Sequence, residues 1–295
     1  MPAAAWGMLL TLSLLWGGSF LFIRVAAVEI PTLTVVFARV AIAAAVLVVV
    51  ARVWGVELPR GWRAWRDHLV MGILNNLIPF VLIVWGQRTI GAGLASILNA
   101  TTPIFGVIVA HLLTSDDKAT PLKAGGVAIA FAGVAVLVGL DALAGLGDHL
   151  LAELACLGAA LSYGFSGLWS RRFRGRPPIA TAAGQLTCSA LVLAPMVVLL
   201  DPPWRQAAPS STAIAAVVAL ALASTALAYI LFFRLTTLVG PTNTMLVTFL
   251  IPPSAIVLGW FFLGERLAGQ HLAGVVLIGL GLAAIDGRLL RRATG

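Results

Sequence analysis

Residues 4–26 read AAWGMLLTLSLLWGGSFLFIRVA, a run of 23 residues in which Arg24 is the only charged side chain. A helix that crosses the hydrocarbon core of a bilayer needs about 20 consecutive, mostly apolar residues. The run therefore predicts a membrane-spanning helix. No Lys or Arg precedes it, so we expect a first span rather than a cleaved signal peptide, which would begin with a basic segment.

Nine further apolar runs of similar length follow, joined by short connections. Of the 295 residues 60% are apolar and 10% are charged, and the mean hydropathy is +1.03. Soluble domains are about 45–50% apolar and about 25% charged, so this chain has too few charges to form a water-soluble surface. We expect an all-α integral membrane protein with ten transmembrane helices, over residues 4–26, 32–53, 67–88, 92–114, 121–140, 149–171, 178–200, 211–235, 241–263 and 269–287.

Lys and Arg are distributed unevenly between the predicted loops. With ten spans both termini lie on one side, and that side carries fourteen of the nineteen basic residues, against four on the other. Because cytoplasmic loops carry such an excess, we expect a multi-pass protein of the cell (inner) membrane with both termini in the cytoplasm. The net charge of +8 is scattered over short segments, so it does not indicate a nucleic-acid partner.

The second half of the chain repeats features of the first. At a shift of 147 residues Gly17 matches Gly164, and at a shift of 149 Pro103 matches Pro252. We expect two halves, residues 1–146 and 147–295, each with five spans. Five is odd, so the second half enters the membrane from the opposite side. Inverted repeats are typical of transporters that bind substrate near the midplane, between the halves.

Several short segments carry a resemblance to a known family: Trp16-Gly17-Gly18-Ser19-Phe20, Phe37-Ala38-Arg39, Ala228-Tyr229, Gly240, Pro252, Leu263-Gly264-Glu265-Arg266 and Gly274. Over essentially its whole length the chain resembles the drug/metabolite transporter superfamily, in particular its ten-helix EamA-type exporters. Within that family it is similar to YddG-type exporters of aromatic and other neutral amino acids. The resemblance implies a transporter, not an enzyme.

Three prolines inside predicted spans each follow a polar residue by four positions. A proline has no N–H, so it leaves a carbonyl one turn earlier without its helical partner. Such a break can serve a midplane binding site or a hinge, or it can be a kink repaired by the polar side chain. The three pairs are Asn75 and Pro79, Asn99 and Pro103, and Thr248 and Pro252.

Polar and aromatic side chains deep in the spans are the other candidates for substrate contact, since they need partners there; packing between helices is the alternative role. Adjacent helical residues such as Asn75 and Asn76 point about 100° apart, so at most one of them faces a substrate squarely. The predicted substrate-binding residues are Trp16, Ser19, Asn75, Asn76, Asn99, Tyr163, Ser166, Tyr229 and Thr248, with Pro79, Pro103 and Pro252 as hinges.

Arg39 is the one charge deep in a span. It can snorkel outward, cap carbonyls of a neighbouring helix or bind a substrate carboxylate. The resemblance places an Arg here in proteins with many kinds of substrate, so we interpret Arg39 as a structural charge.

No acidic residue lies at the middle of a predicted span, and all four histidines lie near span ends. The related small multidrug exporters carry a first-span Glu that exchanges protons for cations, and this chain has no acid before Arg24. We therefore expect facilitated export of a neutral or zwitterionic small molecule, with no cofactor and no metal. A proton-coupled exporter of another metabolite or drug remains the alternative.

Two other classes of membrane protein are remote alternatives. Gly164-Phe165-Ser166-Gly167 matches a string found in intramembrane serine proteases, but such chemistry needs a histidine base beside the serine. A channel would need rings of carbonyls or like charges. The expected partners are a small-molecule substrate and membrane lipid. Ala124, Ala128 and Ala132 permit a close helix contact, within a monomer or in a homodimer.

Overall fold

The computed structural model describes residues 2–115, 118–138, 149–244, 247–266 and 268–286, and all regular structure in these ranges is helical. The elements are α1 Ala3–Ala26, α2 Thr32–Val53, α3 Trp62–Gly72, η1 Ile73–Leu77, α4 Ile78–Gly86, α5 Ala92–Asn99, α6 Thr102–Leu113, α7 Pro121–Val138, α9 Leu150–Trp169, η2 Ser170–Phe173, α10 Pro178–Leu200, η3 Pro203–Arg205, α11 Ser211–Ala221, η4 Leu222–Leu227, α12 Ala228–Thr244, α13 Val247–Leu263 and α14 Gly269–Asp286.

The described ranges contain seven helical stretches long and apolar enough to cross a membrane. They coincide with predicted spans one to four and six to eight. Three shorter apolar helices, Pro121–Val136, Leu250–Leu263 and Gly269–Ala284, coincide with the fifth, ninth and tenth. The all-helical membrane class is confirmed, and the count of ten spans stays a prediction.

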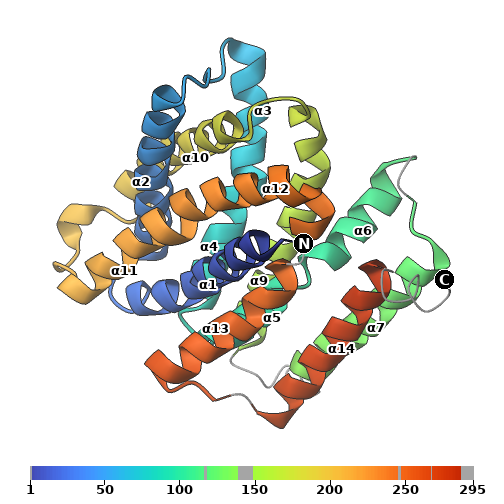
Figure 1. Cartoon of the computed structure of the whole chain (residues 1–295). Coiled ribbons are helices and arrows are strands. Elements are labelled where there is room, and N and C mark those ends of the chain that lie inside the picture. The colour runs from blue at the N-terminus through green and yellow to red at the C-terminus, as the bar shows by residue number, and fades with distance from the viewer. Residues whose placement is uncertain (1, 116–117, 139–148, 245–246, 267, 287–295) are drawn as a thin grey trace.

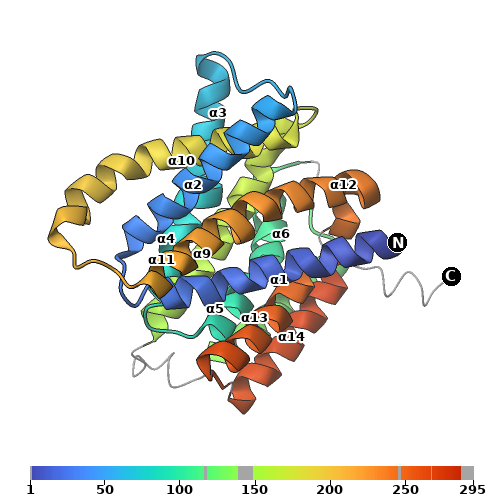
Figure 2. The same cartoon turned by 60° about the vertical axis from the view of Figure 1, so that its left-hand side comes forward.

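Helices far apart in the sequence lie side by side (Figures 1 and 2). The first helix, α1, packs along α13, and α2 packs along α10. Both α4 and α6 pack on α9, while α7 and α14 form a closely packed pair beside the rest. The two halves of the sequence are therefore interleaved in space.

Small residues set the spacing of these pairs. A Cβ added to Gly133 of α7 would lie 2.8 Å from the backbone nitrogen of Ile278 in α14. This pair thus meets through Gly133 and its buried neighbours Gly126 and Ala130. The stripe at Ala124, Ala128 and Ala132 is exposed instead, so it makes no close contact within the described chain.

Gly17 and Gly164, which match each other between the two halves of the sequence, lie at equivalent close helix crossings in the structure. A Cβ on Gly17 would lie 2.7 Å from the Ser254 Cβ and 2.9 Å from the Ala255 nitrogen. A Cβ on Gly164 would lie 3.0 Å from the Phe105 carbonyl carbon and 3.2 Å from the Gly106 nitrogen. The glycines are separated by 147 residues and their partners by 149, the same two shifts that align the sequence. Each half thus supplies a glycine to the same kind of helix crossing.

One end of the molecule, which we call the Arg-poor end, carries the connections that follow α1, α4, α10 and α13. Three carboxylates there accept backbone N–H bonds across the two halves. Glu29 accepts from Ser210 N at 2.7 Å, and Asp201 accepts from Leu33 N at 3.0 Å. Glu265, in the Gly-Glu-Arg turn, accepts from Ala92 N at 2.8 Å and Gly93 N at 3.1 Å. Each acid satisfies donors at the start of a helix in the other half.

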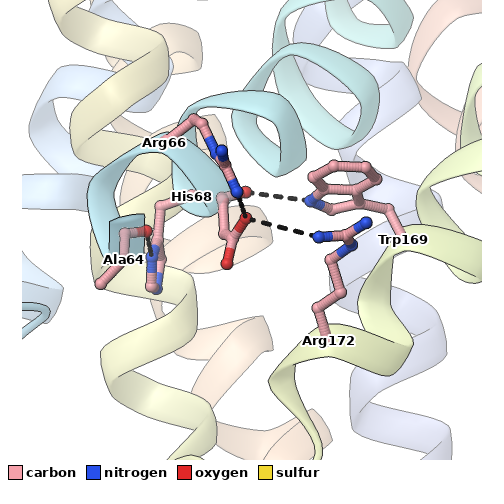
Figure 3. Close-up of polar contacts among 6 residues, drawn as sticks. Ala64, Arg66, His68, Trp169 and Arg172 are labelled. Carbon is pink, nitrogen blue, oxygen red and sulfur yellow. Dashed lines mark hydrogen bonds and ion pairs between the residues drawn. The ribbon is translucent and has the colours of Figure 1, made fainter. Parts of the chain in front are cut away.

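The opposite end is joined around Asp67 in the middle of α3 (Figure 3). The Trp169 indole donates to the Asp67 carbonyl oxygen at 3.1 Å. The Asp67 carboxylate lies 3.6 Å from Arg66 and 3.9 Å from Arg172. Beside it, His68 is bonded through Nδ1 to the Ala64 carbonyl at 2.7 Å. This group ties α3 to the end of α9.

The molecule is more tightly closed at the Arg-poor end. There α5 packs against α1 and α13 and is held by Glu265. Its continuation α6 packs mainly on α9, and extensive packing of α6 on α12 or α13 is absent from the described part of the chain.

Candidate functional site

Two π-helical turns lie at equivalent positions of the two halves. Ile73–Leu77 forms η1 between α3 and α4, and Leu222–Leu227 forms η4 between α11 and α12. A π-turn inserts an extra residue into a helix and occurs frequently at functional sites. Both turns carry polar side chains, Asn75 and Asn76 in the first and Ser224 and Thr225 in the second.

The π-register also changes the effect of Pro79. In η1 the Ile78 N–H bonds the Ile73 carbonyl, five residues earlier. By the same spacing, the carbonyl that Pro79 leaves without a partner is Leu74, rather than Asn75 as α-helical spacing predicts. The Ser162 hydroxyl of α9 donates to the Leu74 oxygen at 2.7 Å. The Leu74 carbonyl that Pro79 leaves without a backbone partner is therefore already hydrogen-bonded by Ser162, a residue of the other half.

The Asn75 side chain is the centre of a polar group that we call the amide cluster. Its Nδ2 donates to the Tyr229 hydroxyl at 3.1 Å, to Gln185 Oε1 at 3.3 Å and to Asn76 Oδ1 at 3.4 Å. Its Oδ1 accepts from the Ser166 hydroxyl at 3.1 Å. Four predicted site residues thus meet, from η1, α9 and α12. The amide cluster consists of Asn75, Asn76, Ser166, Gln185 and Tyr229.

The sequence analysis overlooked Gln185 and Ser189 of α10. Asn76 Nδ2 donates to the Ser189 hydroxyl at 3.3 Å, and that hydroxyl donates to the Gly72 carbonyl at 3.1 Å. A Cβ on Gly72 would lie 2.6 Å from the Gln185 carbonyl oxygen, so glycine is needed for α3 and α10 to approach this closely. Gln185 could have been noticed as a long polar side chain inside an apolar run.

Arg39 lies between α4 and η4 and is 6% exposed. Its Nε donates to the Thr225 hydroxyl at 2.9 Å, and its guanidinium lies 3.6 Å from the centre of the Phe80 ring. Its electrostatic neighbours are Tyr163 and Tyr229. The bond to Thr225 is compatible with the structural role predicted for Arg39, which stays a prediction.

The other predicted contacts of the first span lie outside the amide cluster. The Ser19 hydroxyl donates to the Trp16 carbonyl at 2.6 Å, as Ser166 does to Tyr163 at 2.9 Å. The Trp16 ring is half-buried and packs 5.5 Å from Phe232 of α12. Whether Trp16, Ser19 and Tyr163 contact substrate stays a prediction.

The remaining proline pairs have different local structures. The helix breaks between α5 and α6, and Pro103 lies in the first turn of α6. The Asn99 carbonyl accepts from the Thr102 hydroxyl at 2.7 Å, so it is not left free, whereas the buried Asn99 Oδ1 has no donor among the described residues.

Near the ninth predicted span, the helix is interrupted before Thr248 and Pro252 rather than at them. Gly240, at φ +79°, breaks α12 about one turn before that helix ends at Thr244. Thr248 lies in the first turn of α13, and Pro252 lies inside that helix. Neither residue is joined to the amide cluster by a described contact, and their roles in binding and hinge motion stay predictions.

Charged groups are scarce around the amide cluster. The described residues of α2, α4, α10, η4 and α12 include no Asp or Glu. Glu153 of α9, predicted at a span end, is buried there at 5% exposure, and its Oε2 has no donor in the described ranges. No group of residues suited to hold a metal ion occurs in the part of the chain that the structure describes. The arrangement suits binding of a small polar molecule through hydrogen bonds.

The sequence matches the EamA-like transporter family over residues 4–139 and again over residues 150–285. The chain belongs to this family. The EamA domain thus occurs twice, with η1 in the first match and η4 in the second. The chain is accordingly a transporter-type, multi-pass membrane protein, and the resemblance to the drug/metabolite transporters is confirmed.

Similar proteins match between three quarters and nearly all of the chain. The uncharacterized transporter YoaV of Bacillus subtilis (strain 168) is 23% identical over 279 residues, 93% of this chain and 94% of the relative. A protein of Streptantibioticus cattleyicolor named "Probable terminal-alkyne amino-acid exporter" is 26% identical over 295 residues, 98% of this chain and 95% of the relative. Protein PecM of Dickeya dadantii (strain 3937) is 28% identical over 75% of this chain and 72% of its own.

A solved crystal structure of a protein is similar over 100% of this chain and 99% of its own, with a TM-score of 0.69 and 21% identity. At this identity the likeness shows a shared overall fold alone.

Proposed function

We propose that this protein exports small neutral or zwitterionic metabolites, most consistently amino acids and including aromatic ones, across the inner membrane by facilitated alternating access. The observation that carries the proposal is the amide cluster. Hydrogen-bonding groups from η1, α9, α10 and α12 converge there, with the aromatic rings of Tyr229 and Phe233 stacked 5.8 Å apart beside them. Convergent polar groups against aromatic walls suit a small amphipathic molecule.

The proposed architecture has ten spans in two inverted halves, residues 1–146 and 147–295, with both termini in the cytoplasm. The matched crossings at Gly17 and Gly164 and the matched turns η1 and η4 support the repeat. Under this orientation the Arg-poor end faces outward, and the bonds of Glu265 to α5 close that side. Rocking about the breaks near Pro79, Pro103 and Pro252 would open it.

The rival functions receive less support from the site. Ser166 has Asn75 and the Tyr163 carbonyl as its described partners, and neither can act as the general base of a serine protease. A cationic drug would meet a buried cation, Arg39, and the described residues of α2, α4, α10, η4 and α12 offer it no acid. An amino-acid substrate also agrees with the name of the Streptantibioticus relative, "Probable terminal-alkyne amino-acid exporter".

The test uses purified protein in liposomes loaded with labelled threonine or tryptophan at equal pH on both sides. We expect efflux down the substrate gradient that unlabelled amino acids inhibit by competition. Efflux that begins only when a pH gradient is imposed would keep the substrate and overturn the uncoupled mechanism. No efflux under either condition would overturn amino-acid export and favour another metabolite or drug.

A further inference from the structure

The buried guanidinium of Arg39 is only partly satisfied. Among the described residues, the single hydrogen bond of its side chain is from Nε to Thr225. Among the described residues the Nη atoms have no hydrogen-bond partner, yet neither is among the side-chain nitrogen and oxygen atoms that are both buried and unbonded. The Nη end therefore reaches space that a water-sized molecule can enter, although the residue as a whole is 6% exposed.

Among the described residues no acidic side chain forms an ion pair with this cation. The elements around Arg39 are α2, α4, α9, α10, η4 and α12, and of these only α9 has an acidic residue in the described ranges. The nearest acid of α9 is Glu153, ten residues before Tyr163, or about 15 Å along the helix. An unpaired charge inside a membrane protein is costly, and such a residue commonly marks a substrate or ion site.

The contacts of Arg39 fix the orientation of its guanidinium, including the edge that carries the two Nη atoms. The Thr225 hydroxyl donates to the Leu220 carbonyl at 2.8 Å, which directs an oxygen lone pair toward Arg39 Nε. The Phe80 ring, 3.6 Å away, covers the face of the guanidinium. Stacking uses the face and leaves the in-plane N–H donors available, which is the geometry that binds a carboxylate in a bidentate manner.

The amide cluster lies one helical turn from these contacts. Tyr229 follows Thr225 by four residues, and Asn76 precedes Phe80 by four. Residues at this spacing share a helix face, about 5–6 Å apart. The cluster's bonds to Gln185 Oε1 and Asn76 Oδ1 are long, at 3.3 and 3.4 Å. These oxygens can exchange such weak bonds for a stronger one from an ammonium group.

We propose that Arg39 binds the carboxylate of the transported substrate and that Asn76 and Gln185 accept from its amino group, so that the substrate class is α-amino acids. This inference rests on the proposed function, because it assigns the substrate's charged groups within the same site. It replaces a purely structural role for Arg39 with a direct contact to substrate.

The first test measures binding to the purified wild-type protein by titration calorimetry. The probes are tryptophan and tryptophanamide, threonine and threoninamide, and 3-phenylpropionate and its amide. We expect each acid that binds to bind at least about tenfold more tightly than its amide, as for a buried charged pair. Equal affinities of acid and amide would overturn the role of Arg39.

The second test compares variants for the same probes. Arg39→Gln should reduce the acid-to-amide affinity ratio at least about tenfold while the affinity for the amides changes little. Arg39→Lys should keep part of the ratio. A structural role would instead weaken acids and amides equally. Arg234→Gln, which removes an exposed cation of α12, is the matched control and should behave as wild type.

A third variant covers the case in which Arg39→Gln does not fold. Thr225→Val keeps the charge and the branched shape and removes the hydroxyl that accepts from Arg39 Nε and donates to the Leu220 carbonyl, so it should lower the acid-to-amide ratio severalfold in a folded protein. An unchanged ratio in Thr225→Val would count against the proposed positioning of Arg39.

The outcomes separate the two proposals. If 3-phenylpropionate binds through Arg39 but no amino acid is transported, the carboxylate site stands and amino-acid export fails. If amino acids are transported but their amides bind equally well, export stands and the Arg39 assignment fails. If no probe binds, both fail.

Discussion

At the residue scale, hydrogen-bond partners distinguish the candidate site residues from one another. Asn75, Asn76, Ser166 and Tyr229 were expected from their positions inside the spans, and they meet in one cluster. The Ser19 hydroxyl lies outside this cluster and donates to the Trp16 carbonyl of its own helix. Spacing along a helix indicates which face a residue occupies, but not which helix of the other half will lie against it.

The Tyr229 hydroxyl can be tested without removing its ring. Tyr229→Phe deletes the acceptor of the shortest bond that Asn75 Nδ2 makes, at 3.1 Å. A neutral hydrogen bond is worth about 0.5–1.5 kcal/mol, so we expect KM for efflux to rise roughly two- to tenfold with little loss of folded protein. Phe262→Leu, at an exposed position of α13, is the control. An unchanged KM would separate Tyr229 from the substrate.

Glu29 predicts an effect of pH on stability at the Arg-poor end. Hydrogen bonds from the Ser210 backbone N–H and hydroxyl hold the pKa of Glu29 below its ordinary value of 4.5. Because the folded pKa is depressed, the stabilisation is present at neutral pH and is lost as pH falls below about 4.5. Glu29→Gln should lower Tm at neutral pH and flatten the fall of Tm toward acid.

The control for Glu29 is Glu57→Gln, since Glu57 is an exposed carboxylate outside the Arg-poor end. The measurement is thermal unfolding of the detergent-solubilised protein across this pH range. A Glu29→Gln variant that loses Tm toward acid as steeply as the wild type would contradict the assignment.

At the scale of elements, each half carries the same irregularities. The π-turns η1 and η4 and the close crossings at Gly17 and Gly164 recur at the shifts that align the sequence. The π-turns were not expected, because the extra residue in a turn leaves no distinct trace in apolar periodicity. Because of the π-turn η1, the carbonyl that Pro79 leaves without a backbone partner is that of Leu74 rather than that of Asn75.

The paired prolines of the fourth and ninth spans test the hinge. In the double variant Pro103→Ala and Pro252→Ala the restored N–H groups favour continuous helix, so we expect slower efflux with nearly unchanged substrate affinity. Efflux rate and binding affinity are measured on the same preparation. Unchanged efflux would remove the hinge role from both prolines.

At the scale of the whole molecule, the described carboxylates that accept backbone N–H bonds from the other half lie at one end. Glu29, Asp201 and Glu265 join the halves at the Arg-poor end, so opening there must break backbone hydrogen bonds. The contacts of α6 at the other end are mainly with α9. In this structure the carboxylate bonds thus hold the halves together at the Arg-poor end, on the side that we propose faces outward.

Topology labelling tests which side that is. With Cys156 and Cys188 replaced by Ala, a single cysteine is placed at Glu57 or at Ala207, which are both exposed. A maleimide that cannot cross membranes should label Ala207→Cys in intact cells and label Glu57→Cys only after lysis. The reverse pattern would invert the predicted orientation.

The membrane class, the positions of the apolar helices and the twofold organisation could all be predicted from the sequence. These properties depend on apolar length and on residue matches along the chain, which need no knowledge of neighbours. The sequence also pointed to Asn75 and Tyr229, because a polar group in an apolar run is costly unless it has a partner.

Only the tertiary structure decided which partners they have. Gln185, Ser189 and Thr225 reach the site because α2 and α10 pack against η4 and η1, more than 100 residues away along the chain. The unsatisfied edge of Arg39 likewise follows from the absence of acids in the described residues of α2, α4, α10, η4 and α12, which lie around it. Burial and hydrogen-bond geometry depend on all neighbouring helices at once, so no single segment of sequence determines them.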